Sequence, residues 1–111
     1  MAVDKHGRLI GCGQVKVHRD GSRELASIAV VREWRRRGIA SAIIRELQEG
    51  YGRPLWLTCI SSISPFYEPY GFVEISDLAQ MPPYFRRAKR FFSLYLKLTR
   101  GKEQLAVMVW V

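Results

Sequence analysis

The stretch of residues 24–41, ELASIAVVREWRRRGIAS, holds the change of pattern that decides the fold. Its first eight residues are rich in the β-branched and apolar types that favour a strand. After Gly38 the apolar residues follow the spacing of an amphipathic helix, at Ile39, Ile43, Ile44 and Leu47. The sequence therefore predicts a strand that passes through three arginines and a glycine into a helix.

The rest of the chain alternates between strand and helix patterns. We expect strands over residues 8–18, 24–31, 54–60, 72–75 and 105–111, with residues 1–4 as the end of an earlier strand. Helices are expected from Ile39 to the glycines 50 and 52, and over residues 65–70 and 83–100. Ser64 is expected to be the N-cap of the second helix. This order predicts a mixed α/β sheet in one domain that spans residues 1–111.

Composition excludes several classes of protein. A hydrophobic content of 48%, with 12% aromatic residues, excludes an intrinsically disordered chain. No apolar run approaches the roughly 18 residues of a membrane span, and residues 1–7 lack the apolar stretch of a signal peptide. The chain has 18 Lys and Arg residues and 10 Asp and Glu residues, and its net charge of +8 favours an anionic partner.

The cysteines and histidines form no metal or disulfide pattern. Cys12 and Cys59 stand in apolar stretches and are expected to be buried thiols in a reducing cytoplasm. His6 and His18 are far in sequence from any cluster of cysteines or carboxylates, and we expect them in a turn and on a strand surface. The sequence therefore predicts a cytoplasmic protein without a metal site.

The start of the helix after Gly38 is a candidate anion site. The first N–H groups of a helix have no intrahelical partner, and the helix dipole makes that end positive. Small residues at Gly38, Ala40 and Ser41 leave these donors open, so the backbone forms a cradle of the size of a pyrophosphate. Three consecutive arginines, Arg35, Arg36 and Arg37, add positive charge beside it. The alternative is a solvated arginine turn in which Gly38 only begins a helix.

Two motifs together resemble the GNAT N-acetyltransferase family. Arg35-x-x-Gly38-x-Ala40 follows a strand, and residues 66–72, FYEPYGF, follow the next strand. The family's phosphate-binding motif is Q/R-x-x-G-x-G/A, and a helix similar to FYxxxGF comes after it. The resemblance covers residues 8–75 and implies a GNAT-like acyl-CoA N-acyltransferase fold. The family's first strand and the two helices after it have no counterpart before Met1, so the resemblance implies an N-terminally abbreviated member.

The resemblance implies a site for acetyl-CoA as co-substrate. The backbone N–H groups of Arg36, Arg37, Gly38, Ile39, Ala40 and Ser41 would hold the pyrophosphate, with the side chain of Arg35 beside them. The strand edge at Ile28, Ala29 and Val30 would pair with the pantetheine arm, as an added strand would. The family's splay between the strands matching residues 24–30 and 54–60 would open the cleft for the thioester.

The implied reaction transfers an acetyl group from the thioester to an amine acceptor. Glu24 aligns with a glutamate that some members use as general base; its alternative is a surface strand residue paired with Arg23 or Lys16. The Val30 N–H would stabilise the oxyanion. Tyr67 matches the family's general acid, which protonates the leaving thiolate; its alternative is an ordinary core residue. Tyr70 would be a packing residue one turn later.

The segment 83–100 leaves other functions open. Its apolar stripe consists of Tyr84, Ala88, Phe91, Tyr95 and Leu98, of which Tyr84, Phe91 and Tyr95 are expected to cover the sheet. Its cations are expected to form the solvated face: Arg86, Arg87, Lys89, Arg90, Lys97 and Arg100. These cations could instead contact nucleic acid or an anionic membrane surface. The alternatives are therefore a basic nucleic-acid-binding module and a non-catalytic acyl-CoA-binding protein. A homodimer is possible if strand 105–111 exposes an edge.

Overall fold

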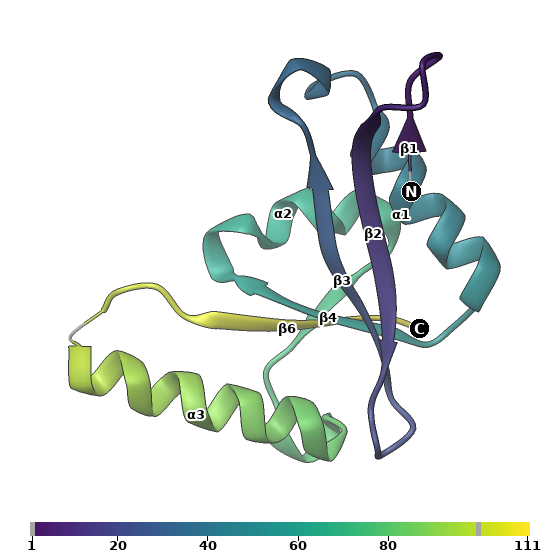
Figure 1. Ribbon diagram of the computed structural model, residues 1–111. Helices are drawn as coiled ribbons and strands as arrows, with labels where there is room; N and C mark the ends of the chain where they lie inside the picture. The colour runs from purple at the N-terminus through teal and green to yellow at the C-terminus, as the bar shows by residue number, and fades with distance from the viewer. Residues whose placement is uncertain (1, 100) are drawn as a thin grey trace.

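The computed structural model describes residues 2–99 and 101–111, and within these residues six strands form one mixed sheet (Figure 1). The strands are β1 (Ala2–Val3), β2 (Leu9–Val17), β3 (Arg23–Val30), β4 (Leu55–Ile60), β5 (Val73–Ile75) and β6 (Leu105–Trp110). Their order across the sheet is β1–β2–β3–β4–β6–β5, with β3 and β4 parallel. Met1, expected in the first strand, and Arg100, expected in the last helix, lie outside the described residues.

The helices lie where the sequence predicts them. The α-helices are α1 (Ile39–Tyr51), α2 (Ser64–Tyr67) and α3 (Pro83–Thr99), and the 3₁₀ turns are η1 (Arg32–Trp34), η2 (Ser61–Ile63), η3 (Glu68–Tyr70) and η4 (Leu78–Gln80). The predicted mixed α/β sheet is therefore confirmed. The predicted N-cap of α2 is wrong, because Ile63 takes that position and Ser64 Oγ donates to the carbonyl of Ser61 from within the helix. None of the described helices is long and apolar enough to cross a bilayer.

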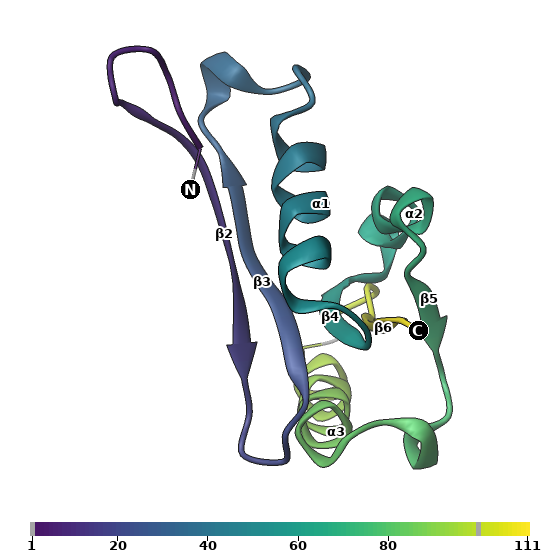
Figure 2. The same cartoon turned by 90° about the vertical axis from the view of Figure 1, so that its right-hand side faces the viewer.

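α1 and α2 pack on one face of the sheet, and α3 packs on the other (Figure 2). Neighbouring residues of one strand point to opposite faces, and β4 serves both cores in this way. Leu55 and Leu57 pack in the core that contains Ile44 of α1. Trp56, between them, packs against the ring of Phe85 of α3, with the ring centroids 5.5 Å apart.

α3 meets the sheet with a different stripe from the predicted one. Phe85 is fully buried, whereas Phe91 and Leu98 of the predicted stripe are 74% and 77% exposed. The helix carries two apolar stripes, and the one that begins at Phe85 and continues through the half-buried Phe92 and Leu96 faces the sheet. The expectation that Phe91 and Tyr95 cover the sheet is therefore wrong.

The strand β6 does not expose the edge that was expected to support a homodimer. It pairs with β4 from Leu105 to Trp110 on one side and with β5 on the other. The outermost strands are β1 and β5. An exposed β6 edge is therefore excluded as the basis of a dimer.

The hairpin between β2 and β3 holds the N-terminal end of α3. His18 stacks on Tyr84 with the ring centroids 3.5 Å apart, and its Nε2 lies 2.8 Å from Oε1 of the buried Glu24. Asp20 accepts a hydrogen bond from the Tyr84 amide. His18 is therefore packed between β3 and α3 rather than on a free strand surface. The two thiols, Cys12 and Cys59, are free and half-buried rather than buried.

Because of the orientation of α3, truncation of two phenylalanines of this helix should lower the free energy of unfolding by different amounts. Phe85→Ala should lower the free energy of unfolding by about 3–5 kcal/mol, because the fully buried ring packs between Trp56 and His18. Phe91→Ala, the matched control, should change it by less than about 0.5 kcal/mol because that ring is exposed. Urea unfolding measures both values, and equal losses would contradict the orientation of the helix.

The stability of the fold should depend on pH through the carboxylate of Asp20. Its pKa is lowered from 3.8 to about 2, first by the hydrogen bond from the Ser22 hydroxyl and then by those from the Tyr84 and Ser22 amides. A carboxylate with a lowered pKa stabilises the fold above its unfolded pKa, and this stability is lost as the pH falls from about 4 to about 2. Asp20→Asn should therefore lose less stability than the wild type over this range, as measured by denaturation at each pH. Parallel curves for the two proteins would contradict the assignment.

Candidate functional site

The strands β3 and β4 meet at their first residues and then diverge. Over the described residues, their parallel register consists of Glu24 opposite Trp56. Figure 1 shows β2 and β3 running at a steep angle to β4 and β6. The half of β3 from Ile28 to Val30 therefore has β2 on one side and no strand on the other.

The open side of β3 carries main-chain groups that do not pair with β2. The Val31 amide donates to the Ile10 carbonyl at 2.8 Å, so Val30 opposite Gly11 occupies a non-hydrogen-bonded position of the antiparallel ladder. The N–H and C=O groups of Val30 therefore point away from β2, toward the side where β4 has diverged.

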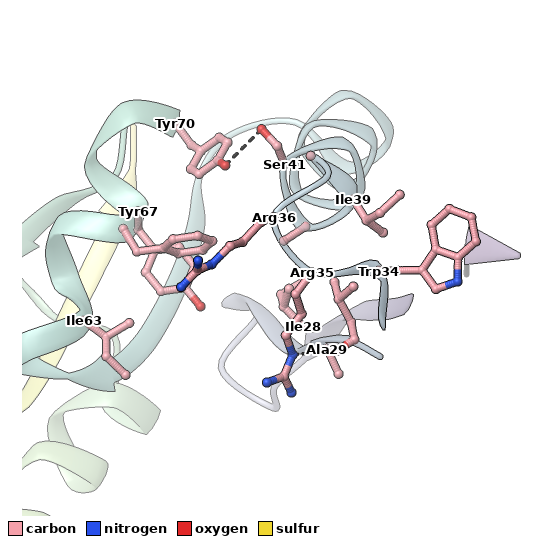
Figure 3. Close-up of a pocket in the computed structure, with 14 residues that line it drawn as sticks. Ile28, Ala29, Trp34, Arg35, Arg36, Ile39, Ser41, Ile63, Tyr67 and Tyr70 are labelled. Atoms are coloured by element: carbon pink, nitrogen blue, oxygen red, sulfur yellow. Dashed lines mark hydrogen bonds between the residues drawn. The ribbon is translucent and has the colours of Figure 1, made fainter. Parts of the chain in front are cut away.

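A cavity of about 500 Å³ occupies the space that this divergence opens (Figure 3). One wall comes from β3, η1 and the first turn of α1, and the other comes from η2, α2 and η3. Its lining residues are Ile28, Ala29, Val30, Trp34, Arg35, Arg36, Gly38, Ile39, Ala40, Ser41, Ile63, Phe66, Tyr67 and Tyr70.

The three arginines before α1 have three different environments. Arg35 Nε donates to the Val30 carbonyl at 3.1 Å, which ties the loop to the end of β3. The guanidinium of Arg36 lines the cavity and extends across it toward α2 in Figure 3. The guanidinium of Arg37 lies 4.8 Å from the centre of the Trp34 ring, and Arg37 does not line the cavity.

Gly38 gives the cavity access to the first turn of α1. It is the N-cap of α1 with φ 78°, a left-handed conformation that glycine adopts without strain. A Cβ atom at Gly38 would meet no atom within 4 Å, so the backbone is open to the cavity at this point. The first turn contains no acidic side chain. Its N–H groups and the positive end of the helix dipole therefore face the cavity without a competing carboxylate.

The opposite wall contains two tyrosines with different roles. The Tyr70 hydroxyl donates to Ser41 Oγ at 2.9 Å and so joins η3 to the first turn of α1 (Figure 3). Burial raises the pKa of Tyr67, with smaller contributions from Cys59 and Tyr70. The Tyr67 phenol is therefore fully protonated at neutral pH and is available as a proton donor.

The structure brings most of the predicted site residues to this cavity, and two of them lie elsewhere. Of the predicted set, Ile28, Ala29, Val30, Arg35, Arg36, Gly38, Ile39, Ala40, Ser41 and Tyr67 line it. Arg37 packs on Trp34, and Glu24 lies at the other end of β3, where its carboxylate pairs with His18. The alternative expectation for Glu24, a surface residue paired with Arg23 or Lys16, is wrong because Glu24 is only 8% exposed.

Four lining residues were not among the predicted site residues: Trp34, Ile63, Phe66 and Tyr70. Ile63 and Phe66 are each 46% exposed, although Ile63 is the N-cap of α2 and Phe66 belongs to this helix, which packs on the core. Apolar side chains left open beside Tyr67 are a sign of a ligand surface, but exposure becomes known only with the fold. Among the described residues, no three His, Cys, Asp or Glu side chains gather as a metal site.

Solved structures with the same fold come from several bacteria. The chain matches a putative streptothricin acetyltransferase from Bacillus anthracis, solved with acetyl-CoA, at a TM-score of 0.66 and 20% identity over 94% of this chain and 57% of that one. It matches a Mycobacterium tuberculosis protein solved with CoA at a TM-score of 0.69 and 21% identity, over 100% of this chain and 72% of that one. It also matches the ribosomal-protein-S18-alanine N-acetyltransferase of Escherichia coli, at a TM-score of 0.60 and 22% identity over 96% of this chain and 63% of that one. The chain thus spans less than two thirds of the Bacillus and Escherichia proteins.

The sequence itself matches a family model. None of the curated proteins compared with the chain matches it. The model described as "Acetyltransferase (GNAT) domain" matches residues 1–74. This match extends from β1 into β5 and includes every residue that lines the cavity. The chain therefore belongs to the GNAT acetyltransferase family.

Proposed function

We propose that the chain binds acetyl-CoA in the cavity between β3 and α2 and transfers the acetyl group to an amine. The observation that supports this most strongly is the convergence of three features on one cavity. These features are the unpaired edge of β3, the arginine loop and the open first turn of α1. An acyl-CoA needs all three, since it combines an amide-bearing arm with a pyrophosphate.

The pyrophosphate would lie against the turn between β3 and α1. The amides of residues 38–41 are donors that the helix leaves unpaired, and Arg36 adds a cation on the same cavity wall. Among the described residues, the non-glycine positions with positive φ are Ser27 and Arg36, at 59° and 65°. One precedes the lining residues of β3 and the other lines the cavity, and unusual backbone of this kind gathers at binding sites.

The pantetheine arm would extend along β3. Within the described residues, no strand pairs with this side of β3 beyond Glu24, so an extended chain of amides can lie along it as an added strand does. The Val30 carbonyl already accepts from Arg35 Nε, and its N–H is the donor that we assign to the oxyanion of the reaction.

In the transfer step, Tyr67 would supply the proton that the leaving thiolate takes up. The neutral amine attacks the thioester carbonyl carbon, the C–S bond breaks, and the electron pair leaves with sulfur. Tyr67 donates its phenolic proton to this thiolate. The proton that the attacking amine releases reaches the Tyr67 phenolate through solvent and restores the phenol. The raised pKa of Tyr67 keeps the donor protonated before the step. Because the Glu24 carboxylate is paired with His18 outside the cavity lining, the proposal assigns it no proton transfer.

A methyl group at the N-cap of α1 should weaken cofactor binding. Gly38→Ala places a side chain at the open backbone of the cradle, and we expect the affinity for acetyl-CoA to fall about 10-fold or more, a loss of about 1.4 kcal/mol. Gly7→Ala is the matched control, since Gly7 has nearly the same φ of 77° and an equally open Cβ position in a remote turn. Calorimetric titration of both variants measures the affinities, and equal values would remove the assigned phosphate site.

Removal of one hydroxyl should separate catalysis from binding. Tyr67→Phe should lower the turnover number about 10²-fold or more, because the leaving thiolate loses its proton donor, while the affinity for acetyl-CoA stays nearly constant. Tyr95→Phe removes the same group from the exposed side of α3 and should change neither quantity. CoA release over a panel of amines measures turnover. A wild-type chain that binds acetyl-CoA and releases no CoA would be a non-catalytic binder, and unchanged turnover in Tyr67→Phe would assign the acid elsewhere.

A further inference from the structure

The outward side of α3 is an apolar surface that no described element covers. Phe91, Leu94, Tyr95 and Leu98 are 74%, 56%, 52% and 77% exposed, and at spacings of three and four residues they share one side of the helix. We call these four residues the outer face of α3. It points away from the sheet, and α3 lies on the opposite face of the sheet from α1 and α2 (Figures 1 and 2).

Unengaged cations border this face. The described part of α3 contains Arg86, Arg87, Lys89, Arg90 and Lys97 and no acidic residue. Arg86 donates to the carbonyls of Leu78 and Met81, and Lys89 donates to that of Leu105, so these two cations serve the fold. Within the described residues, Arg87, Arg90 and Lys97 are exposed and form no ion pair or hydrogen bond. Three free cations therefore lie along the exposed apolar stripe.

We propose that the outer face of α3 binds the surface of an anionic phospholipid bilayer. A helix with aromatic and aliphatic residues on one side and cations beside them lies in the plane of the membrane interface. The outer face would enter the boundary of the acyl chains, and Arg87, Arg90 and Lys97 would reach the phosphate and carboxylate groups of the lipids. The charge of the helix thus selects an anionic surface, and its apolar side chains select one with a hydrocarbon interior.

Two other occupants fit these residues less well. Nucleic acid would engage the cations and could stack on Phe91 and Tyr95, but it offers nothing to Leu94 and Leu98, which are at least as exposed as Tyr95. A second copy of the chain would bring two helices without acidic residues against each other, and their like charges would repel. The bilayer accommodates both the aliphatic tips and the cations.

Binding to a bilayer through α3 would leave the proposed acyl-CoA site accessible. The cavity is lined from β3, the loop before α1 and the α2 wall, and none of its lining residues belongs to α3. A chain that is bound to a bilayer through α3 should therefore retain its affinity for acetyl-CoA. Membrane binding also stands independently of the proposed reaction, since it depends on no residue of the cavity.

Vesicle flotation of the full chain tests the proposal. Vesicles of phosphatidylserine and phosphatidylcholine in a roughly 1:3 ratio should carry the chain, and vesicles of pure phosphatidylcholine should bind it at least about fivefold more weakly. Leu98→Asn should weaken binding to the anionic vesicles about 10-fold, because it removes apolar contact from the outer face. Leu9→Asn is the matched control, since Leu9 is a half-exposed leucine on β2, and it should bind as the wild type does. Arg90→Glu should also weaken binding, and high salt should weaken it in the wild type.

Three results would overturn the proposal. The first is that the wild type floats with neither kind of vesicle. The second is that sedimentation shows self-association that Leu98→Asn abolishes, which would assign the face to a second copy. The third is salt-dependent binding of single-stranded RNA with no vesicle binding, which would assign the cations to nucleic acid. Retention of the wild-type thermal unfolding midpoint by Leu98→Asn and Arg90→Glu would establish that a loss of vesicle binding is not a loss of folding.

Discussion

The single meeting point of β3 and β4 governs the rest of the structure. Glu24 stands opposite Trp56 at the start of both strands, and the strands separate from there. A continuous parallel ladder would pair the main chain of Ile28 and Val30 and leave no room for a ligand. Because the ladder ends early, β3 keeps hydrogen-bonding groups that require another partner. The cavity, its open edge and its position beside the first turn of α1 all follow from this divergence.

Packing on both faces of the sheet keeps the divergence in place. On one face, Gly13 of β2 lets α1 approach so closely that a Cβ atom there would lie 2.7 Å from the Cγ2 atom of Ile43. On the other face, Phe85 contacts Trp56 of β4 and His18, whose ring is bonded to Glu24 of β3. α3 therefore fastens the sheet at the meeting point. The cavity is a product of this packing.

The sequence predicts what local patterns encode and misses what depends on distant contacts. The strands, the helices and the turn at Gly38 follow from propensity and periodicity, so the loop side of the site could be predicted. The orientation of α3 could not, because its two apolar stripes lie one residue apart and only the contacts of Phe85 select between them. The His18–Glu24 pair likewise depends on the register of the hairpin. The wall at Ile63 and Phe66 is defined by space that only the folded sheet leaves open.

The same meeting point bears on the order of events when the chain folds. It joins Glu24, Trp56 and Phe85, residues far apart along the polypeptide, and β4 must also pair with the C-terminal β6. Contacts between distant segments close large loops, and such loops form late because their entropy is lost before the contacts compensate for it. The hairpin of β2 and β3 and the helix α1 can form early from neighbouring residues. The cavity wall formed by η2, α2 and η3 directly follows β4, so we expect this wall to reach its final position after the C-terminal β6 has paired with β4.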